Sequence, residues 1–232
     1  MKRMGVLGGI GPQATIDFEA RVHAVSQRLI PQQGNTGYPP MMVWYHRGFP
    51  VRRDEAGQPL APFEAEPALL DAVRELGKWA DFLAMPCNTA HNVRRELEAA
   101  AGCPILDMIG VTVADVARRR WTRVGVLGFR SAPPILLAAL EAKGIAGETI
   151  GPELQRPLDA AISALMEGRD GKPEADAARA AVASFRARGL EGTILGCTEI
   201  PLLLGAESDA EDLVNPAALL AEAAVRFAIG AE

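Results

Sequence analysis

The sequence lacks the marks of several protein classes. Its three cysteines are an odd number without a Cys-x-x-Cys pair, which excludes a simple disulfide framework and disfavours a zinc site. No apolar run approaches the roughly 18 residues that cross a bilayer. The apolar start of the chain is interrupted by glycines and Pro12, too early for a signal peptide. We therefore expect a cytoplasmic protein with no membrane contact and no metal.

The sequence also lacks a large excess of charge of either sign. The formal net charge is only −5 over 232 residues, which argues against a nucleic-acid partner or an anionic membrane surface. A small anionic substrate is still allowed, because a few local basic groups are enough to bind one. Hydrophobic residues make up 49% of the chain, which is ordinary for a globular core.

Short β-rich runs alternate with longer helical patterns, which predicts an α/β fold with parallel sheets covered on both faces. Ser131 is predicted to cap a helix that follows Pro133. The expected strands are 4–7, 41–46, 81–85, 104–109, 123–127, 192–195 and 213–214. The other expected helices are 12–29, 63–79, 154–167, 174–188 and 216–229, with a polar loop over 47–61.

The two halves of the chain repeat one another. Residues 4–8 resemble residues 124–128, and in each half a later apolar strand leads to a cysteine, Cys87 or Cys197. Glycine-rich strands recur in unrelated parallel sheets, but cysteines at matching strand ends favour duplication. We expect two pseudo-symmetric lobes, with residues 1–110 and 213–232 in the first and 111–212 in the second.

The setting of Cys87 and Cys197 suggests acid–base chemistry. Ligands of open α/β sheets bind beyond the carboxyl ends of the strands, and a helix N-terminus there lowers a thiol pKa from about 8.5. Inverting a stereocentre requires a base on one face and an acid on the other, with sulfurs roughly 7 Å apart. Cys103 lies before a strand and is read as a small buried hydrophobe.

Three segments carry a family resemblance: residues 4–15, 85–91 and 195–200. They resemble the signature blocks of the aspartate/glutamate racemase superfamily, and its aspartate racemase branch most closely. The resemblance implies racemisation of an acidic amino acid, aspartate first and glutamate second, without pyridoxal phosphate or another cofactor. It also implies a homodimer and an active site in the cleft between the lobes.

The same resemblance assigns roles to single residues. Cys87 and Cys197 match the two catalytic cysteines. Asn88, Thr89 and Thr198 match positions that hold the substrate's α-carboxylate and amino group, and Arg52 resembles an arginine that binds a carboxylate. Apart from the resemblance, the glycine loop that contains Gly11 is expected to bring backbone close to the substrate, and Glu199 is expected to orient Cys197, bind the substrate ammonium or cap a helix. Glu167 stands where a lysine is expected in aspartate-specific relatives.

Other functions fit parts of the sequence. Residues 9–14 satisfy the dinucleotide-binding pattern G-x-G-x-x-A, but the second strand ends at His46 without the required acid. A hydantoin racemase, another isomerase of the superfamily or a non-catalytic binding protein for small acids stays open. His91, one helical turn after Cys87, is expected to orient the turn that carries Cys87 rather than to activate the thiol.

Overall fold

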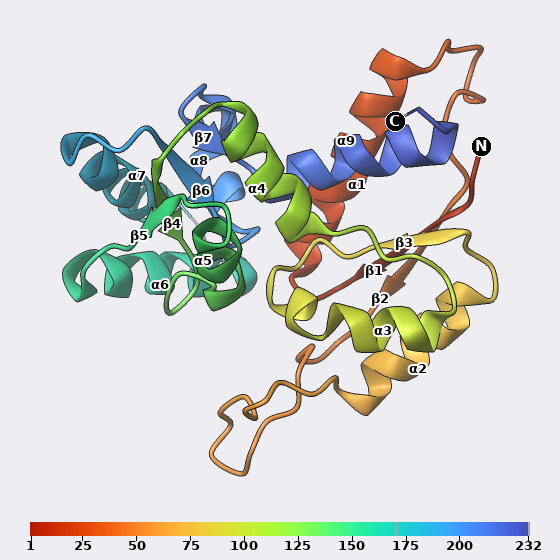
Figure 1. Ribbon diagram of the computed structural model, residues 1–232, viewed down its shortest axis with the longest axis horizontal. Coiled ribbons are helices and arrows are strands. Elements are labelled where there is room, and N and C mark those ends of the chain that lie inside the picture. The colour runs from red at the N-terminus through yellow and green to blue at the C-terminus, as the bar shows by residue number, and fades with distance from the viewer. Residues whose placement is uncertain (170, 232) are drawn as a thin grey trace. The chain divides into compact units, whose positions relative to one another are not determined.

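The computed structural model describes residues 1–169 and 171–231, and the chain divides into two compact units. Unit 1 contains Met1–Met108 and the C-terminal segment from Ala217, and unit 2 contains Ile109–Pro216. Each unit has a parallel sheet flanked by helices (Figure 1), so the predicted α/β class is confirmed. Within the described residues, no helix is long and apolar enough to span a membrane.

The sheet of unit 1 has the strand order β2-β1-β3, with all neighbours parallel. Its strands are β1 (Met4–Gly8), β2 (Met41–Tyr45) and β3 (Phe82–Ala84). In the register, Met4 lies opposite both Met41 and Phe82. The central strand β1 is buried at every position, as a strand covered on both faces should be.

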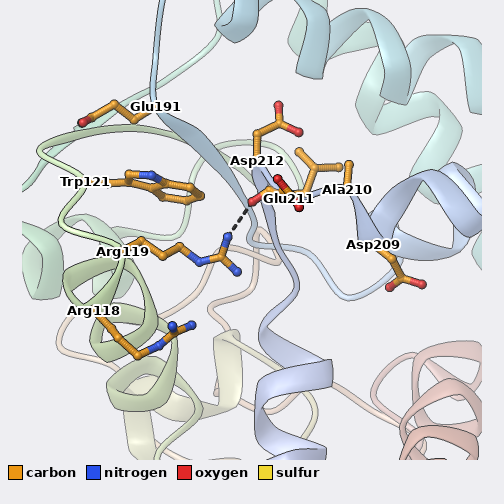
Figure 2. A pocket seen from close by; sticks show the side chains of 9 residues that line it. Arg118, Arg119, Trp121, Glu191, Asp209, Ala210, Glu211 and Asp212 are labelled. Carbon is orange, nitrogen blue, oxygen red and sulfur yellow. Dashed lines mark hydrogen bonds between the residues drawn. The ribbon is translucent and has the colours of Figure 1, made fainter.

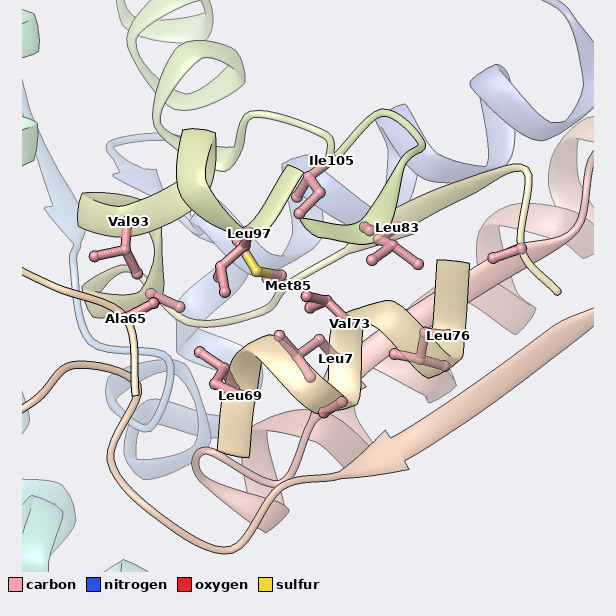
Figure 3. Close-up of a cluster of buried hydrophobic side chains, with 14 of the residues drawn as sticks. Leu7, Ala65, Leu69, Val73, Leu76, Leu83, Met85, Val93, Leu97 and Ile105 are labelled. Atoms are coloured by element: carbon pink, nitrogen blue, oxygen red, sulfur yellow. The ribbon is translucent and has the colours of Figure 1, made fainter. Parts of the chain in front are cut away.

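Two helical layers cover this sheet (Figure 1). Helices α1 (Pro12–Leu29) and α9 (Pro216–Ile229) lie on one face, where Phe18 and Leu220 pack against Val6. Helices α2 (Pro67–Gly77) and α3 (Arg94–Ala101) lie on the other, where Leu69 and Leu97 pack in one cluster with the strands (Figure 3). Because successive side chains of a strand point to opposite faces, β1 contributes to both clusters.

The sheet of unit 2 has the order β5-β4-β6-β7, again parallel throughout. Helices α6 (Pro152–Met166) and α7 (Lys172–Ala187) pack on each other and on the sheet, with Phe185 and Leu195 in one buried cluster. The strands are β4 (Arg123–Leu127), β5 (Ala146–Glu148), β6 (Gly192–Leu195) and β7 (Leu213–Val214). The helices are α4 (Met108–Arg118), which begins at the end of unit 1, α5 (Pro134–Glu141), α6 (Pro152–Met166), α7 (Lys172–Ala187) and α8 (Ile200–Leu204). Short 3-10 helices cover Thr89–Val93 (η1) and Gly205–Asp209 (η2).

Three strands of each sheet have the same order. In each unit the first strand, β1 or β4, lies between the second strand and the strand that precedes the cysteine, and unit 2 adds β7 beyond β6. Cys87 follows β3 and Cys197 follows β6. The repeat seen in the sequence therefore corresponds to a repeat of strand order.

Several predicted elements were wrong. Residues 104–109 form only an isolated bridge at Ile105, beside Leu83, and α4 begins at Met108. The helix predicted from residue 63 begins at Pro67, because the preceding residues belong to a hairpin. The N-cap of α5 is Pro133 and not Ser131. The short strand β5 was not predicted at all.

Candidate active site

A glycine loop joins β1 to α1 and is tied to the helix by Thr15. The buried Thr15 hydroxyl accepts a hydrogen bond from the Gly9 N–H at 2.8 Å and donates one to the Gly11 carbonyl at 3.0 Å. Gly9 has φ +80°, and a Cβ there would lie 2.6 Å from the His46 carbonyl oxygen. Gly11 is the N-cap of α1 and supplies no capping side chain. The loop thus brings backbone, and the positive end of a helix, to the carboxyl end of β1.

Replacing Thr15 with valine tests this loop. The change keeps the side-chain volume but leaves the buried Gly9 N–H without its acceptor, which should cost about 1–3 kcal/mol of unfolding free energy. The Gly9 amide should also exchange with solvent faster. Ser26→Ala is the control, because its hydroxyl bonds to the Val22 carbonyl farther along α1. Unchanged Gly9 protection in Thr15→Val would show that Thr15 does not hold the loop.

Cys87 lies at the carboxyl end of β3, in a turn held by His91. The half-buried Cys87 donates its N–H to the Met85 carbonyl at 2.8 Å. His91 Nδ1 lies 2.9 Å from the Cys87 carbonyl oxygen, and its Nε2 lies 3.1 Å from the Met108 amide nitrogen. The Met108 N–H can only donate, so Nε2 accepts and Nδ1 carries the proton. The Leu106 carbonyl also lies 3.3 Å from Nε2. A hydrogen bond to this carbonyl would require a proton on Nε2 in addition to the one on Nδ1, so the Met108 N–H is the favoured partner of Nε2.

Both ring nitrogens of His91 are therefore committed to backbone groups. Burial is the main cause that lowers the pKa of His91, so the neutral imidazole is the folded form. The ring binds the carbonyl of Cys87 and not its sulfur in these hydrogen bonds. His91 thus orients the turn that carries the thiol, as the sequence predicted.

The residues after Cys87 start the short helix η1. Asn88 is buried and its carbonyl accepts the His91 N–H at 3.1 Å. Thr89 is exposed, and its carbonyl accepts the Asn92 side-chain amide at 3.0 Å. Both residues lie beside Cys87 at the carboxyl edge of the sheet, where the sequence predicted them. Their roles toward a substrate stay predictions.

Cys197 occupies the equivalent turn of unit 2, next to a buried carboxyl group. Its Sγ donates to Glu199 Oε2 at 3.0 Å, and Thr198 Oγ1 donates to the same oxygen at 3.2 Å. Glu199 is only 3% exposed. Burial raises the pKa of the Glu199 carboxyl, while hydrogen bonds from Cys197, its own backbone N–H and Thr198 oppose that rise.

Cys103 differs from the other two thiols. It follows the left-handed Gly102 at the end of α3 and packs against the buried cluster on that face. Burial raises its pKa, as do the nearby carboxylates of Asp81 and Glu98. A raised pKa reduces the thiolate fraction, which fits a packing role. None of the three cysteines, all in the described part of the chain, forms a disulfide.

Arg52 lies in a hairpin held by the Val51–Ala65 and Arg53–Pro59 bridges, within the segment between β2 and α2 that projects from unit 1 in Figure 1. Its guanidinium pairs with Glu64 at 2.6 Å, and the two side chains are 51% and 48% exposed. Arg53 is different, because its guanidinium lies 3.5 Å from the Phe49 ring and donates to the Gly57 carbonyl. An exposed pair of this kind contributes about 0–1 kcal/mol, so Arg52 can exchange Glu64 for another carboxylate at little cost.

Two further features belong to unit 2. Glu167 caps the end of α6 and pairs with Arg169. An open depression of about 680 Å³ lies near the starts of β4, β6 and β7, the opposite edge from Cys197 (Figure 2). There Arg119 lies 4.8 Å from the Trp121 ring, and Glu191 accepts the Thr122 and Arg123 N–H groups. Within the described residues, no cluster of three or more His, Cys, Asp or Glu side chains could hold a metal ion.

Similarity to known proteins identifies the family. A family model described as Asp/Glu/Hydantoin racemase matches residues 7–224. The chain belongs to the Asp/Glu/Hydantoin racemase family. The predicted superfamily and the class of racemase-type isomerases are confirmed at this level.

Individual relatives of this racemase-family chain agree with that assignment. It is 32% identical over 114 residues to the broad specificity amino-acid racemase RacX of Bacillus subtilis (strain 168), over 49% of this chain and 48% of the relative. The match thus spans about half the length of that relative.

Solved structures share the fold. An aspartate racemase homologue from Pyrococcus horikoshii OT3 superposes with a TM-score of 0.77 at 21% identity, covering 99% of this chain and 100% of that one. The Picrophilus torridus aspartate racemase gives 0.75 at 19% identity, covering 98% and 94%. A glutamate racemase from Thermus thermophilus gives 0.60 at 18% identity, covering 99% and 81%. At these identities the likeness bears on the fold alone.

Proposed function

We propose that this racemase-family chain inverts the α-carbon of an acidic amino acid, with Cys87 and Cys197 as the paired acid and base. One observation carries the proposal: the two thiols follow topologically equivalent strands, β3 and β6, at the carboxyl ends of two parallel sheets. Such ends are where open α/β sheets bind ligands.

The reaction needs two proton transfers and no cofactor in this proposal. The thiolate of one cysteine removes the α-proton, which leaves a carbanion whose charge extends into the substrate carboxylate. The thiol of the other cysteine then delivers its proton to the opposite face, so its sulfur becomes the thiolate. The proposal requires both sulfurs to reach one carbon from opposite sides, roughly 7 Å apart.

Backbone and hydroxyl groups beside the thiols would bind the substrate. In this proposal, Asn88, Thr89 and Thr198 hold the α-carboxylate and the amino group, and the Gly11 loop approaches the substrate with backbone N–H groups. Glu199, with a buried carboxyl already bound to Cys197, would act on the thiol or on the ammonium. Arg52 would bind the side-chain carboxylate in place of Glu64. The homodimer expected from the family resemblance stays a prediction.

Aspartate is the first substrate to test and glutamate the second. Two observations require a wider panel. Glu167 stands where a lysine is expected in aspartate-specific relatives, and one relative is named a broad specificity racemase. The experiment is chiral chromatography of both enantiomers of aspartate, glutamate and a set of neutral amino acids, plus a hydantoin, without added cofactor. Inversion of a hydantoin alone, or binding without inversion, would contradict the proposal.

Arg52→Ala tests the specificity. Loss of a hydrogen-bonded charge pair costs about 1.5–3 kcal/mol, so kcat/KM for acidic amino acids should fall roughly tenfold to a hundredfold. Neutral substrates and the unfolding free energy should change little, because the Arg52–Glu64 pair is half exposed. Arg47→Ala is the matched control, because it removes the same charge from an exposed residue over the Tyr45 ring. An equal loss for acidic and neutral substrates would exclude this role for Arg52.

A further inference from the structure

Glu199 is a buried acid whose hydrogen-bond donors are neutral. Glu199 is 3% exposed, and one of its carboxyl oxygens accepts hydrogen bonds from both Cys197 and Thr198. No lysine, arginine or histidine among the described residues makes a salt bridge with it. A buried carboxylate without a cation is costly, so the neutral acid is favoured more than usual.

The Cys197 thiol beside Glu199 is also hard to ionise. If Cys197 lost its proton while Glu199 was ionised, two negative charges would lie 3.0 Å apart in a buried site. Like charges at such a distance do not ionise together readily. If Glu199 is protonated, its O–H can instead donate to the thiolate. The protonation states of the two groups are therefore coupled.

We propose that Glu199 is a positioning residue that acts through Cys197. When the pair is ready to accept a proton, the thiol and the carboxyl group share one proton; when it is ready to donate one, they hold two. In the one-proton form, the proton moves between sulfur and carboxyl oxygen, as S–H beside carboxylate or S⁻ beside carboxylic acid. In the two-proton form, the thiol can give up its proton because the remaining carboxylic acid stabilises the thiolate. The importance of this pair for turnover rests on the proposed function.

The Cys87 turn differs from the Cys197 turn at the matching position. Its second residue after the cysteine is the exposed Thr89, where the other turn has the buried Glu199. The neutral His91 binds the Cys87 carbonyl. The two turns are therefore inequivalent, because the second residue after the cysteine is a buried acid in the Cys197 turn and an exposed hydroxyl residue in the Cys87 turn.

Alkylation of the thiols tests the proposal without any substrate. The intact chain is treated with iodoacetamide over a range of pH, and peptide mass spectrometry gives a separate rate for Cys87, Cys103 and Cys197. In the native sequence, Cys197 should react in two steps with pH, because coupled groups titrate as a pair. Glu199→Gln keeps the shape but removes the second proton site, so Cys197 should titrate in one step. At neutral pH the native pair is mainly S–H beside carboxylate, so removing that negative charge should lower the pKa of Cys197 and raise its alkylation rate, by at most about tenfold for each unit that the pKa falls.

Controls separate this role from a structural one. Glu207→Gln makes the same charge change at an exposed residue paired with Arg179, and should leave the two-step profile intact. The native two-step profile needs no variant, so it tests the proposal even if Glu199→Gln folds poorly. A one-step Cys197 profile in both the native chain and Glu199→Gln would overturn the proposal, and so would equal Cys197 alkylation rates in the two chains. A Glu199→Gln variant that raises KM for amino acids while the Cys197 profile stays unchanged would also overturn it. The alkylation profiles do not depend on whether the protein racemises any substrate, so the proposal can be tested even if the proposed function fails.

Discussion

Cys87→Ala and Cys197→Ala are each expected to lower racemisation by about 10²–10⁴-fold or more, the effect of removing a general acid or base. Inversion needs a proton acceptor on one face and a donor on the other, so either loss interrupts both directions. The double variant should be little worse than either single one, because groups that act as a unit are not additive. Chiral chromatography on purified, folded variants measures this.

Cys103→Ala is the control for the thiol variants. Cys103 is also half-buried but lies at the end of α3, packed against an apolar cluster. Its removal should leave racemisation within about twofold and cost at most a small part of the 5–15 kcal/mol that stabilises a typical domain. Substantial racemisation in Cys87→Ala or Cys197→Ala, or a folded but inactive Cys103→Ala, would show that the wrong thiols were chosen.

His91→Leu should have the second largest effect, on stability and activity together. The change removes the ring nitrogen that donates to the Cys87 carbonyl and the ring nitrogen that accepts from the Met108 N–H. Losing one such hydrogen bond in a buried site costs about 1–3 kcal/mol, so the unfolding free energy should fall by roughly 2–6 kcal/mol. Because the lost bond is to the residue that carries the thiol, kcat should fall as well. Denaturant titration and racemisation measure the two effects.

The pH dependence of stability gives an independent test of the neutral imidazole. Burial lowers the pKa of His91 in the folded chain. Below the unfolded value of about 6.5, the unfolded chain binds a proton that the folded chain resists, so stability should fall as the pH falls. His91→Leu should lose this part of the acid dependence. His23→Leu should keep it, because His23 is exposed beside Tyr38. Parallel acid profiles for the native and His91→Leu chains would contradict the neutral assignment.

Local patterns predicted most of the fold. The strands β4 and β6 and the helix α1 were predicted almost to the residue. Their patterns, a continuous apolar run or a helical spacing of apolar residues, are local and can be recognised from neighbouring residues in the sequence. The errors occurred where distant contacts decide. Ala65 donates its N–H to Glu96 on α3, and Arg52 donates its backbone N–H to the Glu64 carbonyl. These bonds hold residues 63–66 in a hairpin, although their apolar spacing continues the pattern of α2.

The candidate site shows the same division. The sequence could place Cys87 and Cys197 at strand ends, and it could place His91 one turn from Cys87. It could not choose among the three roles considered for Glu199, because burial and the 3.0 Å contact with Cys197 depend on how α8 folds back. Thr15 received no role from the sequence, although it lies one helical turn after Gly11. A search for hydroxyl residues at that spacing after a glycine loop would have found it.

Racemisation of one enantiomer in D2O tests the two-thiol account most directly. L-Aspartate, or whichever acidic amino acid the panel identifies, is incubated with the native chain, and both enantiomers are analysed early for α-deuterium. If one thiol removes the proton and the other delivers a solvent-derived deuteron, the product should carry deuterium from the start. The remaining substrate should keep its protium, because the first thiol can return only the proton that it took. Product that retains the α-proton, or substrate that exchanges as fast as product forms, would contradict the account.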